Sequence, residues 1–530
     1  IQEEVEAPET ASTLARVTPR KTEFVDVPQI SDVVSIEGTE HDVVVTTNRN
    51  GEALLKAAAG SKYDADKHLG LYVDSTIHVD ATSGVLNIGA DDSHNSSTGK
   101  IAIGANGVVV INVSGLNGEA AFDAQNGVVL NKDATVILSD MLTTGNYLLS
   151  TSGFEMQGDN LSTTNGWLTG SVSTVEGKGG NWFVAEFNRN FADEDVSAIV
   201  EQFVQPGSES ARVMAQFGNV NGPFVGEDGK LTAEGEELIY EYVSTPVVAG
   251  TYNVAYDAAE QVTGAIQRRN IEPSTGLGVW ADVFYSANEA KNIYGGAGYD
   301  ADIYGGVIGF DWTASCGAKL GAAVSVGTGD ADSVGTLGKY SNDADFWGLT
   351  VYTGKDIGGL YFSADVSYIS LDNDISGTYN MGTENVDSSV FTVGLRADMT
   401  VYESAGKGCK VVPHVGVRYS NIDVDDYRDI KADSMDVFET PIGVKFAGDF
   451  ATASGWTVTP NFDFTIVPQL GDKDVNTLDG KVDILDSVYN STLGVNASCG
   501  NFTFGLSYRY GFGNDDRSNN AFQARASYAF

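Results

Sequence analysis

The chain has little cysteine, histidine or basic charge. Its 530 residues include 3 Cys, 5 His and 31 Lys or Arg, against 72 Asp or Glu, which gives a formal net charge of −41. No two cysteines form a C-x-x-C pair, which excludes zinc-ribbon and thioredoxin-type sites. So acidic a chain repels phosphate backbones, which excludes a nucleic-acid partner. No run of about 20 apolar residues is present, so no membrane-spanning helix is expected.

Motifs of known catalytic chemistry are also missing. The sequence contains no G-x-S-x-G elbow, no H-E-x-x-H zinc pair and no G-x-x-x-x-G-K-[ST] phosphate loop. His94 lies near Asp91, Asp92 and Ser96, but surface loops show this composition far more often than catalytic triads do. We therefore expect no enzymatic activity, no cofactor and no specific metal site.

The beginning of the chain carries no signal segment. Residues 1–40 are largely polar and unpatterned, with neither a basic n-region nor an apolar h-region after Ile1. We interpret them as a linker or a cut end. Either a signal peptide has been removed, or the chain is a piece of a longer precursor.

The second half shows strict alternation of apolar and polar residues. From Gly276 onward, segments of about ten residues alternate as β-strands do. The polar face carries Gly, Ser, Thr and isolated charges of both signs, whereas the apolar face is aromatic and continues from strand to strand. This pattern is typical of a membrane barrel with lipid outside and a polar lumen. In LYFSADVSY the apolar set is Leu360, Phe362, Ala364, Val366 and Tyr368.

This alternation predicts an all-β half made of about twelve antiparallel strands within residues 276–530. The barrel must close, because an open edge would leave backbone groups unpaired in hydrocarbon. The last strand, FQARASYAF, ends on an aromatic residue. The alternation assigns these charged side chains to the lumen: Asp365, Arg396, Asp398, Asp463, Arg509 and Arg525.

Connections of two lengths alternate along this half. Short ones such as ASCGA are expected at the periplasmic end, and long polar ones such as DNDISGTYNMGTENVD at the outside. Cys316, Cys409 and Cys499 fall at short turns about a third of the rim apart, which is too far for a disulfide.

The long connections are rich in aspartate. We interpret them as solvated loops; weak, shared binding of Ca²⁺ or Mg²⁺ is the alternative, since none has the spacing of a calcium-binding hand. Their acidic residues include Asp330, Asp332, Asp372 and Asp374.

One helical stretch, residues 254–270, precedes the barrel. Small residues are dense in it, and a proline follows it as a stop. A slim helix at this position is compatible with a plug inside the lumen; a helix packed at the barrel mouth is the alternative. Its apolar side is formed by Val254, Ala258, Val262 and Ile266, and its last turn carries Arg268 and Arg269, which suit the helix dipole.

The first half reads as a stack of short strands. NGVVVIN at 106–112 returns as NGVVLN at 126–131, a spacing of twenty, and GVLNIG at 84–89 and GKIAIG at 99–104 are looser copies. Such a period with Asn-Gly turns suggests the coils of a parallel β-helix over 41–190. Residues 191–250 differ in pattern and are interpreted as a cap and neck.

These parts together resemble the type V autotransporters of Gram-negative bacteria. GLGVWADVFY at the barrel start and FQARASYAF at the end are similar to the edges of that family's β-domain. The resemblance implies a twelve-stranded barrel over 276–530, a linker helix in its pore over 251–275, and a short β-helical passenger at the cell surface.

The resemblance also implies partners. These are outer-membrane lipid and lipopolysaccharide, periplasmic chaperones, the barrel-assembly machinery and a surface ligand. The terminal strand would be the signal that the assembly machinery reads, through Phe522, Ala524, Ala526, Tyr528 and Phe530. Some family members cut themselves between two adjacent Asn residues of the pore helix; this helix has no Asn-Asn pair, so we expect the passenger to stay attached.

Four functions follow for comparison. The leading one is a non-enzymatic surface protein that serves in adhesion or surface architecture. A structural envelope protein, bridged into an array by divalent cations, is the second. A secreted hydrolase lacks any supporting motif, and a general porin is disfavoured by the predicted plug.

Overall fold

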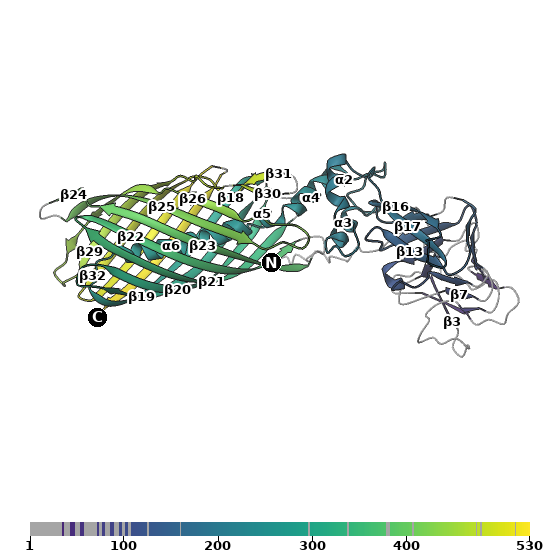
Figure 1. Ribbon diagram of the computed structural model, residues 1–530, viewed down its shortest axis with the longest axis horizontal. Coiled ribbons are helices and arrows are strands. Elements are labelled where there is room, and N and C mark those ends of the chain that lie inside the picture. The colour runs from purple at the N-terminus through teal and green to yellow at the C-terminus, as the bar shows by residue number, and fades with distance from the viewer. Residues whose placement is uncertain are drawn as a thin grey trace, which may run out of the picture. The chain divides into compact units, whose positions relative to one another are not determined.

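The computed structural model divides the chain into two compact units, residues 1–236 and 237–530 (Figure 1). It describes residues 108–530 except 125–126, 159–160, 295–296, 336–338, 378–381, 405–407, 473, 478–479 and 515, and only the backbone strands of residues 1–107. Most of the expected N-terminal linker, together with His94, lies outside the described residues. No helix in the described part is both long and apolar enough to cross a membrane.

Parallel strands stack into coils in the first unit. Each coil gives one strand to each of three sheets, whose orders include β4-β7-β10-β13, β5-β8-β11-β14 and β6-β9-β12-β15. The side chains of Val109, Ile111, Val136 and Leu138 are fully buried between the sheets. The strands are β4 (Tyr72–Val73), β5 (Ile77–Val79), β6 (Val85–Ile88), β7 (Asn95–Ser97), β8 (Ile101–Ile103), β9 (Val108–Asn112), β10 (Phe122–Ala124), β11 (Val128–Leu130), β12 (Thr135–Ser139), β13 (Gly145–Ser150), β14 (Phe154–Met156) and β15 (Leu161–Thr163).

The coil repeat is longer than the period of twenty that the sequence suggested. Val85 pairs with Val108, 23 positions on, and Val108 pairs with Thr135, a further 27 positions on. The two similar segments at 106–112 and 126–131 contribute to different sheets and do not pair with each other. Every coil contains three short strands that all need buried aliphatic residues. The apparent repeat of twenty residues therefore aligned two strands that belong to different sheets.

An antiparallel pair and two helices end the stack. β16 (Leu168–Ser173) pairs with β17 (Asn181–Phe187), and α2 (Glu194–Glu201) and α3 (Ala211–Phe217) follow. Trp167 is fully buried, stacks on Phe187 at 5.9 Å and donates from Nε1 to the carbonyl oxygen of Met214. These elements supply the apolar cover that the last coil of a solenoid needs.

Twelve antiparallel strands in the described part of the second unit close into a barrel, because β18 pairs with both β19 and β34. β24 continues β23, and β26, β27 and β28 together form the eighth strand. The strands are β18 (Gly276–Tyr294), β19 (Ala297–Thr313), β20 (Lys319–Val334), β21 (Tyr340–Ile357), β22 (Leu360–Gly377), β23 (Thr383–Met399), β24 (Tyr402–Glu403), β25 (Cys409–Val424), β26 (Met435–Glu439), β27 (Ile442–Gly448), β28 (Phe450–Ala451), β29 (Thr457–Val467), β32 (Val488–Cys499), β33 (Phe502–Phe512) and β34 (Ser518–Ala529).

The outer face of the barrel is an apolar band between two aromatic girdles. Ile308 and Leu349, in the middle of the band, are 66% and 54% exposed. We call the end with short connections the turn end and the other the loop end. Ring contacts mark the girdle near the loop end (Tyr285–Tyr304, Trp347–Tyr368 and Tyr508–Phe522) and the one at the turn end (Phe502–Tyr528 and Tyr528–Phe530). Bands and girdles of this kind border the hydrocarbon of an outer membrane.

Beyond the girdle near the loop end, the two faces of the wall exchange character. In β22, Ile369, Leu371 and Ile375 point inward and are at most 1% exposed, while Asp372 and Asp374 face outward. The strands continue here as a water-exposed extension of the barrel, with an apolar inside and an acidic outside.

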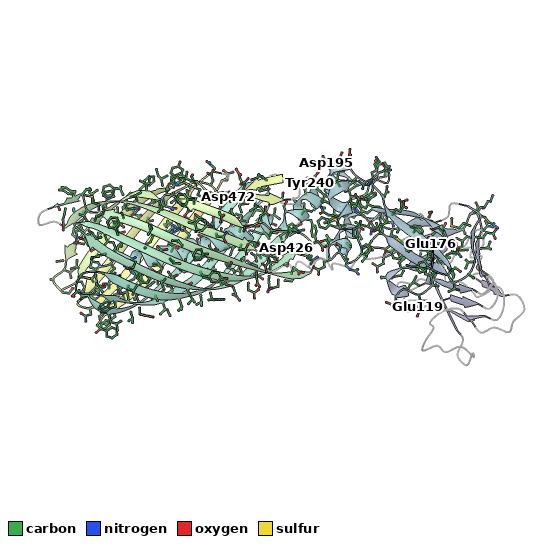
Figure 2. All side chains as sticks on the ribbon, in the orientation of Figure 1. Glu119, Glu176, Asp195, Tyr240, Asp426 and Asp472 are labelled. Carbon is green, nitrogen blue, oxygen red and sulfur yellow. The ribbon has the colours of Figure 1, made fainter. Side chains whose placement is uncertain are left out.

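Aspartates form rows across this extension. Asp302 lies opposite Asp330, Asp330 opposite Asp343, and Asp343 opposite Asp374. Like charges in such positions weaken strand pairing, so the buried apolar side chains must hold these strands together. Asp426 and Asp472, both labelled in Figure 2, lie in connections of the loop end.

The expectation that Asp330, Asp332, Asp372 and Asp374 belong to loops was therefore wrong. The alternation continues through these aspartates, but with the apolar residues in the opposite phase. The apolar residues of the outer face therefore end before the strands do.

Three helices of the described part lead directly into the barrel: α4 (Ala233–Val243), α5 (Thr245–Val248) and α6 (Thr251–Asn270). Tyr242 is fully buried and meets the ring of Tyr427 at 6.3 Å. Gly250, with φ of +69°, makes the bend between α5 and α6, and a Cβ there would lie 3.2 Å from the ring of Tyr299. The extension and these helices thus share one apolar core outside the band.

The position of the band predicts where a charge is tolerated. Leu349→Arg should destabilise the folded barrel by about 2–4 kcal/mol, because it places a cation near the middle of the hydrocarbon. Asp345→Arg, four residues nearer the loop end on the same face, should cost no comparable stability. Urea unfolding of the full chain in lipid vesicles measures both; equal losses would contradict the assigned boundary.

Candidate functional site: the plugged barrel lumen

Helix α6 lies inside the barrel and packs against β18–β23 and β25 (Figure 1). Val254, Ala258, Val262 and Ile266 are all fully buried. Polar residues of the helix, such as Asp257, are buried as well, so the helix meets a wall that carries hydrogen-bonding partners. The helix is therefore a plug in the lumen, as the sequence predicted.

A buried ion pair holds the turn-end part of the helix. Arg269 donates from Nε and Nη2 to the two carboxylate oxygens of Asp311, at 2.6 and 2.7 Å, and both side chains are at most 2% exposed. Tyr352 donates to the same carboxylate, and Trp280 donates to the Tyr352 hydroxyl, both at 2.7–2.8 Å. A buried ion pair is stable only when its remaining donors and acceptors are satisfied in this way.

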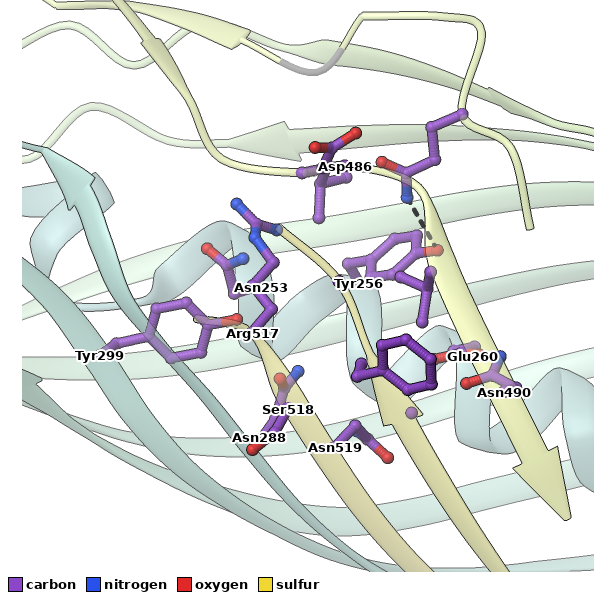
Figure 3. Close-up of a pocket in the computed structure, with 16 residues that line it drawn as sticks. Asn253, Tyr256, Glu260, Asn288, Tyr299, Asp486, Asn490, Arg517, Ser518 and Asn519 are labelled. Carbon is purple, nitrogen blue, oxygen red and sulfur yellow. Dashed lines mark hydrogen bonds between the residues drawn. The ribbon is translucent and has the colours of Figure 1, made fainter. Parts of the chain in front are cut away.

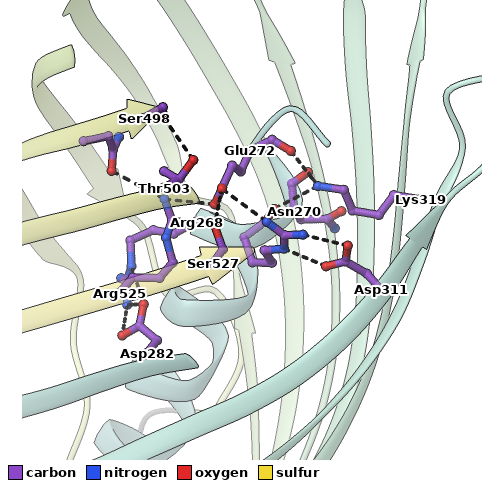
Figure 4. A network of polar contacts seen from close by, with 12 residues as sticks. Arg268, Asn270, Glu272, Asp282, Asp311, Lys319, Ser498, Thr503, Arg525 and Ser527 are labelled. Atoms are coloured by element: carbon purple, nitrogen blue, oxygen red, sulfur yellow. Dashed lines mark hydrogen bonds and ion pairs between the residues drawn. The ribbon is translucent and has the colours of Figure 1, made fainter. Parts of the chain in front are cut away.

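Two further cationic side chains, those of Arg268 and Lys319, form polar contacts near this pair (Figure 4). Arg268 pairs with Asp282 of β18 at 3.1 Å. Lys319 of β20 donates from Nζ to the carbonyl oxygens of Arg269, Asn270 and Glu272, at 2.6–3.0 Å. The last carbonyls of a helix have no partners within the helix and carry its negative dipole end, so this ammonium group caps α6 from the barrel wall.

The middle of the helix is held by a hydrogen-bonded cluster. The Asp257 carboxylate accepts from Ser286 at 2.7 Å, from Gln261 at 3.0 Å and from Asn519 at 3.2 Å. One turn on, Glu260 pairs with Arg509 of β33 at 2.7 Å.

The loop-end part of the helix also bonds to the barrel. Tyr252 donates to the carbonyl oxygen of Asp433, Asn253 donates to that of Ile484, and Tyr256 donates to the Glu439 carboxylate. A cavity of about 40 Å³ lies between this part of the helix and β32–β34, with Tyr256, Glu260 and Asn490 in its lining (Figure 3). The helix is thus tied to the wall at three levels.

The six charged residues assigned to the lumen all carry lumen contacts. Arg396 bonds to Asp398 at 2.7 Å and to Gln267 of the helix, and Arg525 pairs with Glu272, just after the helix, at 3.2 Å. On the wall, Asp463 pairs with His414 at 3.1 Å and Asp365 lies 4.0 Å from Arg418. Arg509 pairs with Glu260 as described.

The sequence reasoning missed the residues that bind the helix most directly. Asp282, Asp311 and Lys319 all occupy inward positions of the alternating pattern of β18–β20, so this pattern is the signal that assigns them to the lumen. Their pairing with Arg268 and Arg269 depends on the rotation of the helix, which the sequence does not define.

The last strand closes the barrel against the first. β34 pairs with β18 from Ala529–Gly278 to Ser518–Glu289, and the amide of Phe530 donates to the carbonyl oxygen of Leu277 at 2.8 Å. Phe522 and Phe530 face outward, 53% and 68% exposed. Ala524, Ala526 and Tyr528 share that face, while Gln523 and Arg525 face the lumen.

The three cysteines lie at the turn end as free thiols. Cys316 lies in the turn between β19 and β20, Cys409 begins β25 and Cys499 ends β32.

A closed antiparallel barrel with a lipid-facing exterior, a polar lumen and a helix inside defines an outer-membrane barrel protein of a Gram-negative bacterium. The comparison with protein families narrows the class of barrel protein: residues 279–526 match the family model of the autotransporter β-domain. The barrel half of the chain is thus similar to the autotransporter β-domain, an outer-membrane barrel that translocates a passenger, and the resemblance to a type V autotransporter is confirmed.

Three of the solved structures that are similar to this chain are autotransporter domains. They are the β-domain of the Bordetella autotransporter BrkA (20% identity, 48% of this chain and 100% of that one, TM-score 0.39), the translocator domain of NalP from Neisseria meningitidis (15%, 54% and 99%, 0.42) and the transport unit of AIDA-I from Escherichia coli (12%, 53% and 99%, 0.43). The chain shows no significant match to a curated protein sequence.

The buried pair of Arg269 and Asp311 predicts an asymmetric response to substitution. Asp311→Ala should cost about 3–5 kcal/mol, because it leaves the buried Nε and Nη2 donors of Arg269 without acceptors and Glu272 as its remaining charge partner. The double variant Arg269→Met/Asp311→Leu removes both charges and should recover most of that loss. Denaturant unfolding of the full chain measures both; a double variant as unstable as the single one would contradict the assignment.

Proposed function

We propose that the chain displays its own N-terminal β-helix at the cell surface and keeps it anchored through the plugged barrel. The observation that carries this proposal is the continuity of α6, which leads into β18 and is bound along its whole length to the lumen wall. A chain held in this way tethers whatever precedes the helix to the membrane.

We propose further that the passenger stays attached. The asparagines of α6 are Asn253 and Asn270, at opposite ends of the helix, and their side chains donate to the carbonyl oxygens of Ile484 and Thr353. They offer no adjacent Asn pair for self-cleavage.

The passenger is proposed to act by binding rather than by catalysis, in adhesion or surface architecture, with an unidentified surface ligand. The absence of catalytic motifs from the sequence supports this. Outer-membrane lipid and lipopolysaccharide, periplasmic chaperones and the barrel-assembly machinery are the further partners proposed.

The rows of aspartate on the barrel extension favour one alternative, an envelope protein whose copies are bridged by Ca²⁺ or Mg²⁺. Asp330 has an aspartate opposite it on both neighbouring strands, and a divalent cation would relieve that repulsion. If copies of the protein associate in washed outer membranes and a chelator disperses them, the result would favour the envelope protein over an adhesin.

Attachment predicts a single species at the cell surface. The protein extracted from whole cells should run as one chain in a denaturing gel and carry both passenger and barrel epitopes. Two fragments separated near residues 245–270 would contradict attachment.

The closing strand predicts an effect of charge at Phe530. Phe530→Asp should lower outer-membrane insertion several-fold, because it puts a carboxylate in the aromatic girdle and alters the proposed assembly signal. Leu470→Asp introduces the same charge at an exposed position of a loop-end connection and should insert normally. The folded fraction in isolated outer membranes, from unheated gels, measures both; normal insertion of Phe530→Asp would remove the proposed signal.

A further inference from the structure

Helix α6 fills only one side of the lumen. Five of its residues are half-buried and follow one stripe at helical spacing: Tyr256, Glu260, Gly264, Gln267 and Arg268. The helix packs against β18–β23 and β25, where inward side chains such as Trp280 and Tyr352 are at most 2% exposed. Water-sized space therefore runs along the opposite side of the helix.

The wall that faces this space is built from small polar residues. On β29, β32 and β33 most inward positions are half-buried, and most belong to residues with short side chains; Arg509, which pairs with Glu260, is a long exception. The exposure continues to Ser498 and Thr503 at the turn end. The set includes Thr459, Asn461, Thr492, Asn496, Ser498, Thr503 and Ser507.

Lys445 places a positive charge in this space without a partner of its own. It occupies an inward position of β27, directly opposite Asp463 on β29. The Asp463 carboxylate, however, accepts from His414 at 3.1 Å and from Thr465 at 2.6 Å. Within the described residues, no carboxylate oxygen lies within ion-pair distance of the Lys445 ammonium group.

Arg525 adds a second incompletely satisfied cation. Its side chain is 6% exposed and pairs through Nη2 with Glu272 at 3.2 Å. Its Nε and Nη1 atoms are buried without a hydrogen-bond partner among the described residues. A buried guanidinium normally satisfies these donors, so the described acceptors do not fully balance the positive charge of Arg525.

We propose that this side of the lumen is a water-filled vestibule, open at the turn end, that binds small anions at Lys445 and Arg525. The ligand class is an anionic group of the size of phosphate or a carboxylate. The neighbouring carboxylates are already engaged: Asp398 by Arg396, Asp463 by His414 and Glu272 by Arg269.

Charged thiol reagents test the vestibule. In the full chain with Cys316, Cys409 and Cys499 replaced by serine, Thr492→Cys introduces one thiol on the strand next to Asp463. An anionic methanethiosulfonate should modify it several-fold faster than a cationic one, and inorganic phosphate should slow the anionic reagent. Lys445→Glu should reverse the order of the two rates.

Lys481→Glu makes the same charge change at an exposed loop-end position and should leave both rates unchanged. Heat-modifiable gel mobility and surface display of the passenger show that each variant is folded and competent in translocation, independently of the vestibule. If Lys445→Glu fails to insert, Lys445→Gln takes its place and should abolish the preference. The proposal would be overturned if the thiol did not react, if the two reagents reacted at equal rates, or if substitution of Lys445 left both rates unchanged.

Discussion

The closed wall of the barrel determines where every charge in the second unit can lie. Hydrocarbon surrounds the outer face, so each charged side chain within the band must point inward. Inside, a guanidinium or carboxylate needs a partner, because an unpaired charge in a confined lumen is costly. The helix supplies those partners: Arg268 pairs with Asp282, Arg269 with Asp311, and Glu260 with Arg509. Plug and wall are therefore complementary parts of one electrostatic arrangement.

The sizes of the inward side chains explain why the plug does not fill the lumen. The helix lies where large inward residues such as Trp280 and Tyr352 build a close-fitting wall, and the small polar residues of β29, β32 and β33 leave water on the other side. Beyond the aromatic girdle the hydrocarbon ends, and the wall becomes acidic outside and apolar inside. The residue types on each face of the band and of the extension thus follow from whether that face contacts lipid, water or the apolar core.

Much of the barrel could be predicted from the sequence, since alternation at period two is imposed by lipid on one face and water on the other. The inward positions of Asp365 and Arg525 follow from this alternation. The slim profile of the helix is compatible with a place in the lumen, and the resemblance to autotransporters implied that place. The extension was missed because Leu371 and Ile375 are apolar in the opposite phase to Val366. The ion pairs of Arg268 and Arg269 depend on helix rotation, which is set by tertiary packing. The β-helix repeat was misread because strands of all three sheets need the same aliphatic residues.

Helix α6, bound to the wall by its ion pairs, closes the barrel. The most direct test compares single-channel conductance in a planar bilayer for the full chain and for a variant that lacks residues 251–270. We expect a small conductance for the full chain and a large, steady conductance for the variant. A large, steady conductance of the full chain would contradict this expectation.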